Sequence, residues 1–296
     1  MIIDKFKDYL LLEKKYSLNT VNAYCKDVEV FFEFCCDKLS HDDLTTVVYF
    51  HIRSWIISLV EKGVSNRTIN RKVSSLSAFY KFLLKVGEIK TSPLVKHKSL
   101  KVEKKSKIPF SESEVQNVLK LFQETPKGFS DLRDRLILEM LYSTGIRRAE
   151  LINISVSDVN FYKSELKVLG KRGKERIIPV LNSTLELMKL YQESFKEKFG
   201  KDFSGCFFVT DRGDKIYENF VFRLVNRYFS KVSVKKNISP HVLRHSFATH
   251  LLNNGADLNS VKELLGHSSL AATQVYTHNN IYQLAKVYRN SHPRNK

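Results

Sequence analysis

Apolar residues recur at three- and four-residue spacing along most of the chain, which predicts a mainly helical protein. Two apolar stripes stand out early, from Leu18 to Cys35 and from Ile69 to Phe82. Ser17 suits the N-cap of the first helix, and Gly87 suits the end of the second. We therefore expect residues 1–90 to form a helical domain with its own core.

The second half of the chain mixes helical spacing with one stretch of alternation. Ser111 to Glu114 form a reciprocal capping pattern at a helix start, and Leu132 to Ser143 predict another helix. Residues 164–180 alternate around a basic tip and predict a β-hairpin, which a strand at Cys206 to Thr210 would join. The expected fold is mainly α with a small β-sheet in a C-terminal domain, residues 110–296.

Between these domains, residues 91–109 are lysine-rich, bounded by proline and without periodicity, so we interpret them as an exposed basic linker. The whole chain has a formal net charge of +18. Solvated surface lysines would explain part of this charge. A polyanionic partner explains it better, because neutralising phosphates releases counterions.

The helix predicted over residues 66–86 is apolar on one side and carries Arg67, Arg71, Lys72 and Lys81 on the other. Such a helix could line a DNA groove or lie on an anionic membrane surface. Neighbouring helices that need its apolar side for a core favour the DNA interpretation.

Signals for export or membrane insertion are missing from the sequence. The four cysteines form no CxxC pair, the N-terminus has no signal-peptide pattern, and no apolar run approaches the roughly 18 residues of a membrane span. We expect a cytoplasmic protein in a reducing compartment.

Candidate chemistry concentrates between Ser239 and His278. A Ser-Pro helix start favours anions, and His241 and Arg244 follow it three residues apart on one face, as a phosphate clamp would require. A zinc site built on His241, His245 and His250 is the alternative, but Arg244 between these histidines is unfavourable for a cation.

Two further cations lie earlier in the chain. Arg147 follows a predicted helix end in TGIRRAEL, and Glu150 would either orient its guanidinium or be exposed. Lys171 lies at the hairpin tip, where an ammonium could protonate a leaving oxygen, and Lys174 is its rival.

The last two candidates follow the phosphate clamp. His267, after Leu264-Leu265-Gly266, could hydrogen-bond a phosphate oxygen or help to deprotonate a nucleophile. Tyr276 could be that nucleophile if neighbouring cations help to remove its proton.

Together, TGIRRAEL, LGKRGKER, SPHVLRHSFATHLL, LLGHSS and the YTH at 276–278 closely resemble the tyrosine recombinase (lambda-type integrase) family, and most of all its Xer-type members. The resemblance implies a core-binding domain and a catalytic domain that form a clamp on DNA, with residues 279–296 as an exchanged helix. It implies four protomers, of one or two related recombinases, on two duplexes, with a DNA translocase as a possible activator. It also implies catalysis without metal or cofactor by the six candidates Arg147, Lys171, His241, Arg244, His267 and Tyr276.

Other functions remain open at this point. An integrase of a mobile element would use the same residues, and a type IB topoisomerase shares the chemistry. A sequence-specific DNA-binding protein without catalysis is a rival from a different class.

Overall fold

The computed structural model describes residues 2–103, 108–122, 128–170, 173–203, 205–266 and 278–295, without the side chains of 278–283. The chain divides into two compact units, residues 1–105 and 106–296. Each unit has a separate hydrophobic core.

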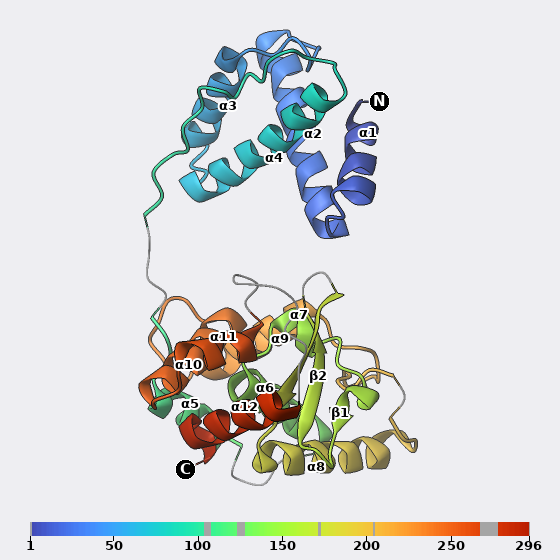
Figure 1. Cartoon of the computed structure of the whole chain (residues 1–296), viewed down its shortest axis with the longest axis vertical. Helices are drawn as coiled ribbons and strands as arrows, with labels where there is room; N and C mark the ends of the chain where they lie inside the picture. The colour runs from blue at the N-terminus through green and yellow to red at the C-terminus, as the bar shows by residue number, and fades with distance from the viewer. Residues whose placement is uncertain are drawn as a thin grey trace. The chain divides into compact units, whose positions relative to one another are not determined.

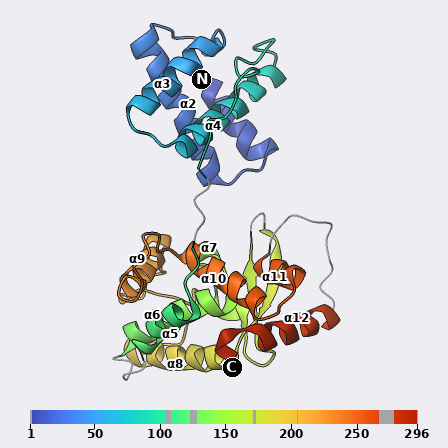
Figure 2. The same cartoon turned by 90° about the vertical axis from the view of Figure 1, so that its left-hand side faces the viewer.

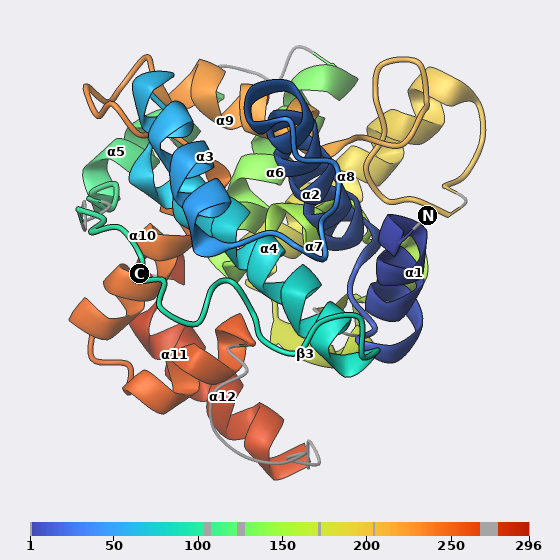
Figure 3. The same cartoon turned by 90° about the horizontal axis from the view of Figure 1, so that it is seen from above.

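The first unit is built from helices alone in its described residues (Figure 3). Ser17 caps the helix that begins at Leu18, as the sequence predicts, and Gly87 follows the end of the helix that begins at Asn66 with φ of +78°. Phe31, Trp55 and Leu76 are fully or almost fully buried between the helices. The elements are α1 (Ile2–Asp8), the π-helical turn η1 (Tyr9–Glu13), α2 (Leu18–Leu39), α3 (Tyr49–Glu61) and α4 (Asn66–Lys85).

Part of the basic side of α4 pairs with a carboxylate inside this unit. Asp27 of α2 is buried and accepts hydrogen bonds from Arg71 at 2.5 and 3.0 Å, from Lys72 at 2.9 Å and from Ser75 at 2.8 Å. A buried carboxylate requires such partners. Two of the four cations expected to face a partner therefore hold α4 against α2, while Arg67 and Lys81 are exposed.

The start of the predicted linker packs against the first unit instead of being free in solvent. The Asn70 side chain donates to Leu100 O and accepts from Leu100 N, at 2.8 and 2.9 Å, and Asn66 donates to Lys101 O. Leu94 and Leu100 pack partly against the core of this unit. The exposed span is thus shorter than the sequence suggests.

The second unit is organised around α6 (Phe129–Thr144), which is buried on most sides from Leu136 onwards. It packs against α8 and α10 (Figure 1). The helices of this unit are α5 (Glu112–Lys120), α6, α7 (Arg148–Leu151), α8 (Asn182–Phe199), α9 (Glu218–Phe229), α10 (Pro240–Asn253), α11 (Leu258–Leu265) and α12 (His278–Ser291), with the 3-10 turns η2 (Val156–Asp158) and η4 (Pro293–Asn295).

A three-stranded antiparallel sheet, in the order β1-β2-β3, completes the unit: β1 (Val159–Asn160), β2 (Glu165–Leu169) and β3 (Glu175–Pro179). Its hairpin confirms the one predicted over residues 164–180. The expected addition of Cys206 to Thr210 is wrong, because Cys206 bridges Ser155 and Val209 bridges Lys215 instead. The third strand is β1, which was too short to be recognised from its periodicity.

The last helix, α12, lies against β3, α10 and α11 of its own unit (Figure 2). Leu284 and Tyr288 are buried in that core, and the Tyr288 hydroxyl donates to Ser143 O at 2.7 Å. Arg294 then forms an ion pair with the buried carboxylate of Glu139 at 3.0 Å. In this single chain the helix is docked on the unit to which it belongs.

Candidate active site

The first site residue is positioned by the end of α6. Gly145 has φ of +60°, and a Cβ there would come within 2.3 Å of the Phe247 ring, so glycine is required. The chain then turns, and Arg147 becomes the N-cap of α7. Glu150 closes this turn, because its carboxylate accepts from Arg147 N at 2.8 Å and from Arg147 Nη1 at 2.7 Å. Of the two interpretations of Glu150, orientation of the guanidinium is confirmed.

The second pair comes from the start of α10. Ser239 caps this helix by accepting a hydrogen bond from Val242 N, and Pro240 occupies its first turn, as predicted. His241 is exposed, and Arg244 is buried one turn later. Their three-residue spacing places them on one face of the helix.

Arg147 and Arg244 meet at the C-terminal end of α11. Arg244 donates to Gly145 O at 2.5 Å and to Leu265 O at 2.6 Å, while Arg147 Nη2 donates to Gly266 O at 3.3 Å. The fold thus brings two of the predicted cations, almost 100 residues apart in sequence, onto the same short stretch of backbone.

A third arginine, which is not among the six residues predicted from the sequence, completes this cluster. Arg176 of β3 is buried and donates to both oxygens of Glu150, at 2.9 and 2.8 Å, and to Leu264 O at 3.0 Å. A signal for it existed: Arg176 precedes Ile178 by two residues, so both side chains face the same, buried side of the strand.

Positive charge exceeds negative charge in this cluster. Burial opposes ionisation of Glu150, but hydrogen bonds from Arg176 and Arg147 outweigh it and lower its pKa to about 2. Burial, reinforced by the nearby charge of Arg147, lowers the pKa of Arg244 to about 9, which leaves it charged at neutral pH. Within the described part of the chain Arg244 forms no ion pair. Three guanidinium groups around one carboxylate favour an incoming anion such as a phosphate.

Three of the six candidates, Lys171, His267 and Tyr276, lie outside the described residues. The structure does describe the rival, Lys174. Its side chain is exposed, and its backbone carbonyl accepts a hydrogen bond from Gly170 N at 2.8 Å, next to the end of the β2–β3 hairpin ladder.

The histidine set considered for zinc is engaged differently. His250 is buried, with Nδ1 2.8 Å from the Tyr142 hydroxyl and Nε2 2.9 Å from Phe110 O. Both ring nitrogens therefore serve the packing of α10 against α6 and the segment before α5. Among the described residues, no three or more histidine, cysteine, aspartate or glutamate side chains lie together where they could hold a metal ion.

Comparison with known proteins shows the family to which the chain belongs. Residues 91–282 match the phage integrase family, and residues 3–87 match the phage integrase N-terminal SAM-like domain. The chain therefore belongs to the phage integrase family, and the expected tyrosine recombinase resemblance is confirmed.

Relatives that align over nearly the whole chain carry more specific names. The tyrosine recombinase XerC of Oceanobacillus iheyensis is 38% identical, over 99% of this chain and 96% of its own. The tyrosine recombinase XerD of Staphylococcus saprophyticus is 36% identical, over 99% of each chain.

Solved structures show the same fold at lower identity. XerH site-specific recombinase bound to palindromic difH substrate is 18% identical with a TM-score of 0.72, covering 99% of this chain and 82% of that one. The Tn1549 transposon integrase in complex with transposon right end DNA is 20% identical with a TM-score of 0.68, covering 97% and 94%. The mainly α fold with a small sheet is confirmed. None of the described helices has the length and apolarity to span a membrane.

Proposed function

We propose that this protein is a site-specific DNA recombinase that cuts and rejoins strands through a covalent 3′-phosphotyrosine. One observation carries the proposal: Arg147 and Arg244, from separate segments, converge on the end of α11 with more positive than negative charge around them. The XerC and XerD relatives support the same function.

The cations would act on one scissile phosphate. Arg147, Arg244, His241 and His267 would hold its non-bridging oxygens and stabilise the charge that builds up in the transition state. Arginine is suited to this role because its planar fork donates two parallel hydrogen bonds.

Tyr276 would be the nucleophile. Its phenol loses its proton to a neighbouring base, for which His267 is the candidate, and the oxygen attacks phosphorus as the bond to the 5′ oxygen breaks. Lys171 donates a proton to that 5′ oxygen, which leaves as a 5′-hydroxyl. The 5′-hydroxyl of the partner strand then attacks the phosphotyrosine and releases Tyr276. Each step exchanges one phosphodiester for another, so the chemistry itself requires no ATP, metal or cofactor.

Replacing the nucleophile tests this proposal. On a nicked suicide duplex, the wild-type protein should become covalently trapped, and Tyr276→Phe should bind the duplex without forming the adduct. Adducts that persist in Tyr276→Phe would refute the assignment. Binding without trapping by the wild type would indicate a non-catalytic DNA-binding protein, and relaxation of supercoils without strand exchange would indicate a topoisomerase.

The cellular role we propose is resolution of chromosome dimers in the cytoplasm, during chromosome partition and cell division. Integration of a mobile element is the alternative, because the reaction is identical. Sequencing the DNA covalently trapped by the protein in cells separates the two: a chromosomal site supports the first, and element ends support the second.

In this proposal, residues 1–90 and 110–296 would close as a clamp around double-stranded DNA, joined by residues 91–109, the start of which packs against the first unit. Four protomers, of this chain or of this chain and a related recombinase, would hold two duplexes, and a translocase could activate them. Within the tetramer, α12 would be exchanged between neighbours. Sedimentation with site-bearing duplexes should yield complexes of four protomers and two duplexes, and a limit of two protomers would contradict the tetramer.

A further inference from the structure

We infer that Arg176 is a positioning residue for the strand-cleavage reaction. It holds Glu150 in place so that Arg147 can present its charge to the phosphate. The inference rests on the proposed function and concerns a residue that would not touch the DNA. It is carried by the geometry of three segments that meet at one side chain.

The location of Arg176 is unusual for a charged residue. It lies on the inward face of the sheet, in register with Val168 and two residues before Ile178, both of which are buried. Burying a guanidinium is costly unless its donors are satisfied. Each of its three nitrogens donates one hydrogen bond: Nη1 and Nη2 form a bidentate pair with Glu150, and Nε donates to Leu264 O.

Glu150 is the shared partner in this arrangement. Each of its oxygens accepts one hydrogen bond from Arg176 and one from Arg147. A carboxylate that faced Arg147 alone would neutralise it and weaken its attraction for a phosphate. Because Arg176 offsets the charge of Glu150, the carboxylate can orient Arg147 while that guanidinium keeps its positive charge for the DNA.

Arg176 also fixes the end of α11, where the arginines converge. A Cβ at Gly266 would lie 3.0 Å from Arg176 Cδ and 3.2 Å from Nε, so the glycine leaves room for the side chain to pass. Gly266 O in turn accepts the hydrogen bond from Arg147. One guanidinium thus connects β3, α7 and the last turn of α11.

The first test is Arg176→Lys, which keeps the charge but cannot form the bidentate pair. Single-turnover cleavage of a saturating nicked duplex should slow by about 10²-fold, the usual consequence of misplacing a reacting group. Affinity for an uncut duplex, measured in a Tyr276→Phe background, should not change. A normal cleavage rate would overturn the inference, and so would a rate loss explained entirely by weaker binding.

A double-variant cycle tests whether Arg176 acts through Glu150. Arg176→Gln, Glu150→Gln and the combination should be compared, and the combination should be no slower than the slower single variant. The combination removes both members of the Arg176–Glu150 pair, so neither is left buried without the other, and it tests the inference even if Arg176→Gln fails to fold. Losses that multiply would show that the two residues act independently.

Changing the leaving atom distinguishes two ways in which Arg176 could affect cleavage: through Arg147 and the phosphate, or through protonation of the leaving group. With sulfur in place of the 5′-bridging oxygen, the leaving thiolate is a weak base and needs no proton donor. The slow cleavage by Arg176→Lys should persist on this substrate, because the defect lies in how Arg147 stabilises the phosphate in the transition state and not in protonation of the leaving atom. Recovery on the sulfur substrate would mean that Arg176 acts through the hairpin tip and its proposed acid Lys171, which would overturn the route through Arg147.

Arg133→Lys is the matched control. Arg133 is equally buried and pairs with Asp134 at 2.9 Å, but it does not contact the arginine cluster. Its cleavage rate should equal that of the wild type. If the wild type itself forms no adduct, the proposed function fails. If the wild type cleaves and Arg176→Lys cleaves equally fast, only this inference fails.

Discussion

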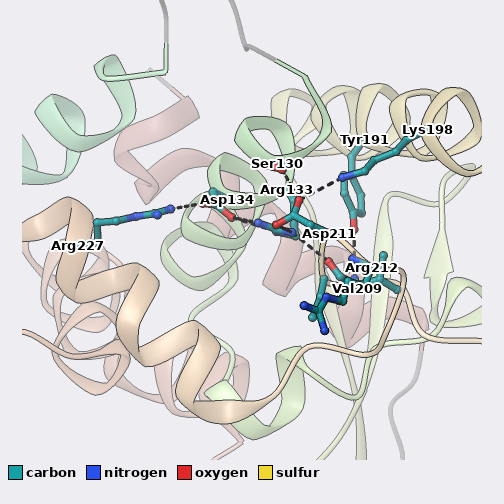
Figure 4. Close-up of polar contacts among 10 residues, drawn as sticks. Ser130, Arg133, Asp134, Tyr191, Lys198, Val209, Asp211, Arg212 and Arg227 are labelled. Atoms are coloured by element: carbon teal, nitrogen blue, oxygen red, sulfur yellow. Dashed lines mark hydrogen bonds and ion pairs between the residues drawn. The ribbon is translucent and has the colours of Figure 1, made fainter.

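Two clusters of arginine and carboxylate lie inside the second unit, and their charge balance differs. We call the first the site cluster: Arg147, Arg176, Arg244 and Glu150. We call the second the scaffold cluster: Arg133, Asp134, Asp211 and Arg227, with Ser130 and Lys198 at its edge (Figure 4). Both join several segments, so the number of contacts does not distinguish them.

The scaffold cluster is balanced where it is buried. Arg133 lies between Asp134, at 2.9 Å, and Asp211, at 3.3 Å, and Arg227 reaches Asp134 at 2.6 Å from a side chain that is 60% exposed. The site cluster instead buries Arg176 and Arg244 with the single carboxylate of Glu150. Surplus buried charge costs stability, so its presence indicates a ligand that compensates for it.

The largest effect should come from the two arginines of the site cluster that would hold the phosphate. Arg244→Ala, or Arg147→Ala, should slow cleavage by about 10³-fold or more, equivalent to about 4 kcal/mol of transition-state stabilisation. The measurement is single-turnover adduct formation on the nicked duplex. A rate near that of the wild type would mean that the site cluster is merely architectural.

The same kind of change in the scaffold cluster should act on folding. Arg133→Met leaves Asp134 buried with only the mostly exposed Arg227, and the free energy of unfolding should fall by about 3 kcal/mol. Urea denaturation measures this loss, and cleavage at a temperature where the variant is folded should be unchanged. Slower cleavage by the folded variant would remove the distinction between the clusters.

Lowering the pH should change the contributions of the two clusters to the free energy of unfolding in opposite directions. Glu150 has a folded pKa of about 2, below the ordinary 4.5, so its stabilisation is present above about pH 4.5 and is lost as pH falls towards 2. That contribution is roughly 3 kcal/mol. Glu150→Gln should therefore flatten the loss of stability in acid.

Asp134 should behave oppositely. Burial raises its pKa in spite of its arginine partners, so its contribution to stability is present at low pH and is lost as pH rises through the folded pKa. Asp134→Asn should steepen the loss of stability in acid. The test is to measure the free energy of unfolding of both variants between pH 2 and 6. If both substitutions change the pH dependence of that free energy in the same direction, the difference between the clusters is refuted.

The smallest effect concerns the glycine beside Arg176. Gly266→Ala places a Cβ at φ of +63° and 3.0 Å from Arg176 Cδ, and should cost about 1–2 kcal/mol of stability and slow cleavage. Gly200→Ala is the control, since Gly200 has φ of +64° with nothing within 4 Å of its Cβ position. It should lose some stability through backbone strain and cleave normally. Equal cleavage by both variants would contradict the role of Gly266.

Local signals predicted local structure well. The capping residues Ser17, Ser111 and Ser239 begin helices where expected, because a cap depends only on the next three residues. The hairpin likewise follows from alternation within one segment. The strand expected at Cys206 to Thr210 failed because strand pairing depends on a partner elsewhere in the chain.

The sequence by itself determined the mainly helical fold, the small sheet, the basic character and the motifs that identify the family, since these depend on composition and on spacing within short windows. Only the tertiary structure decided which charges are neutralised. It paired Arg71 and Lys72 with Asp27, placed Arg176 inside against Glu150, and directed Arg244 to the carbonyl oxygens of Gly145 and Leu265. Those pairings join residues tens of positions apart, and their energy depends on burial. Periodicity predicts which face of a helix or strand is buried, but it does not predict which residue will lie opposite a buried charge.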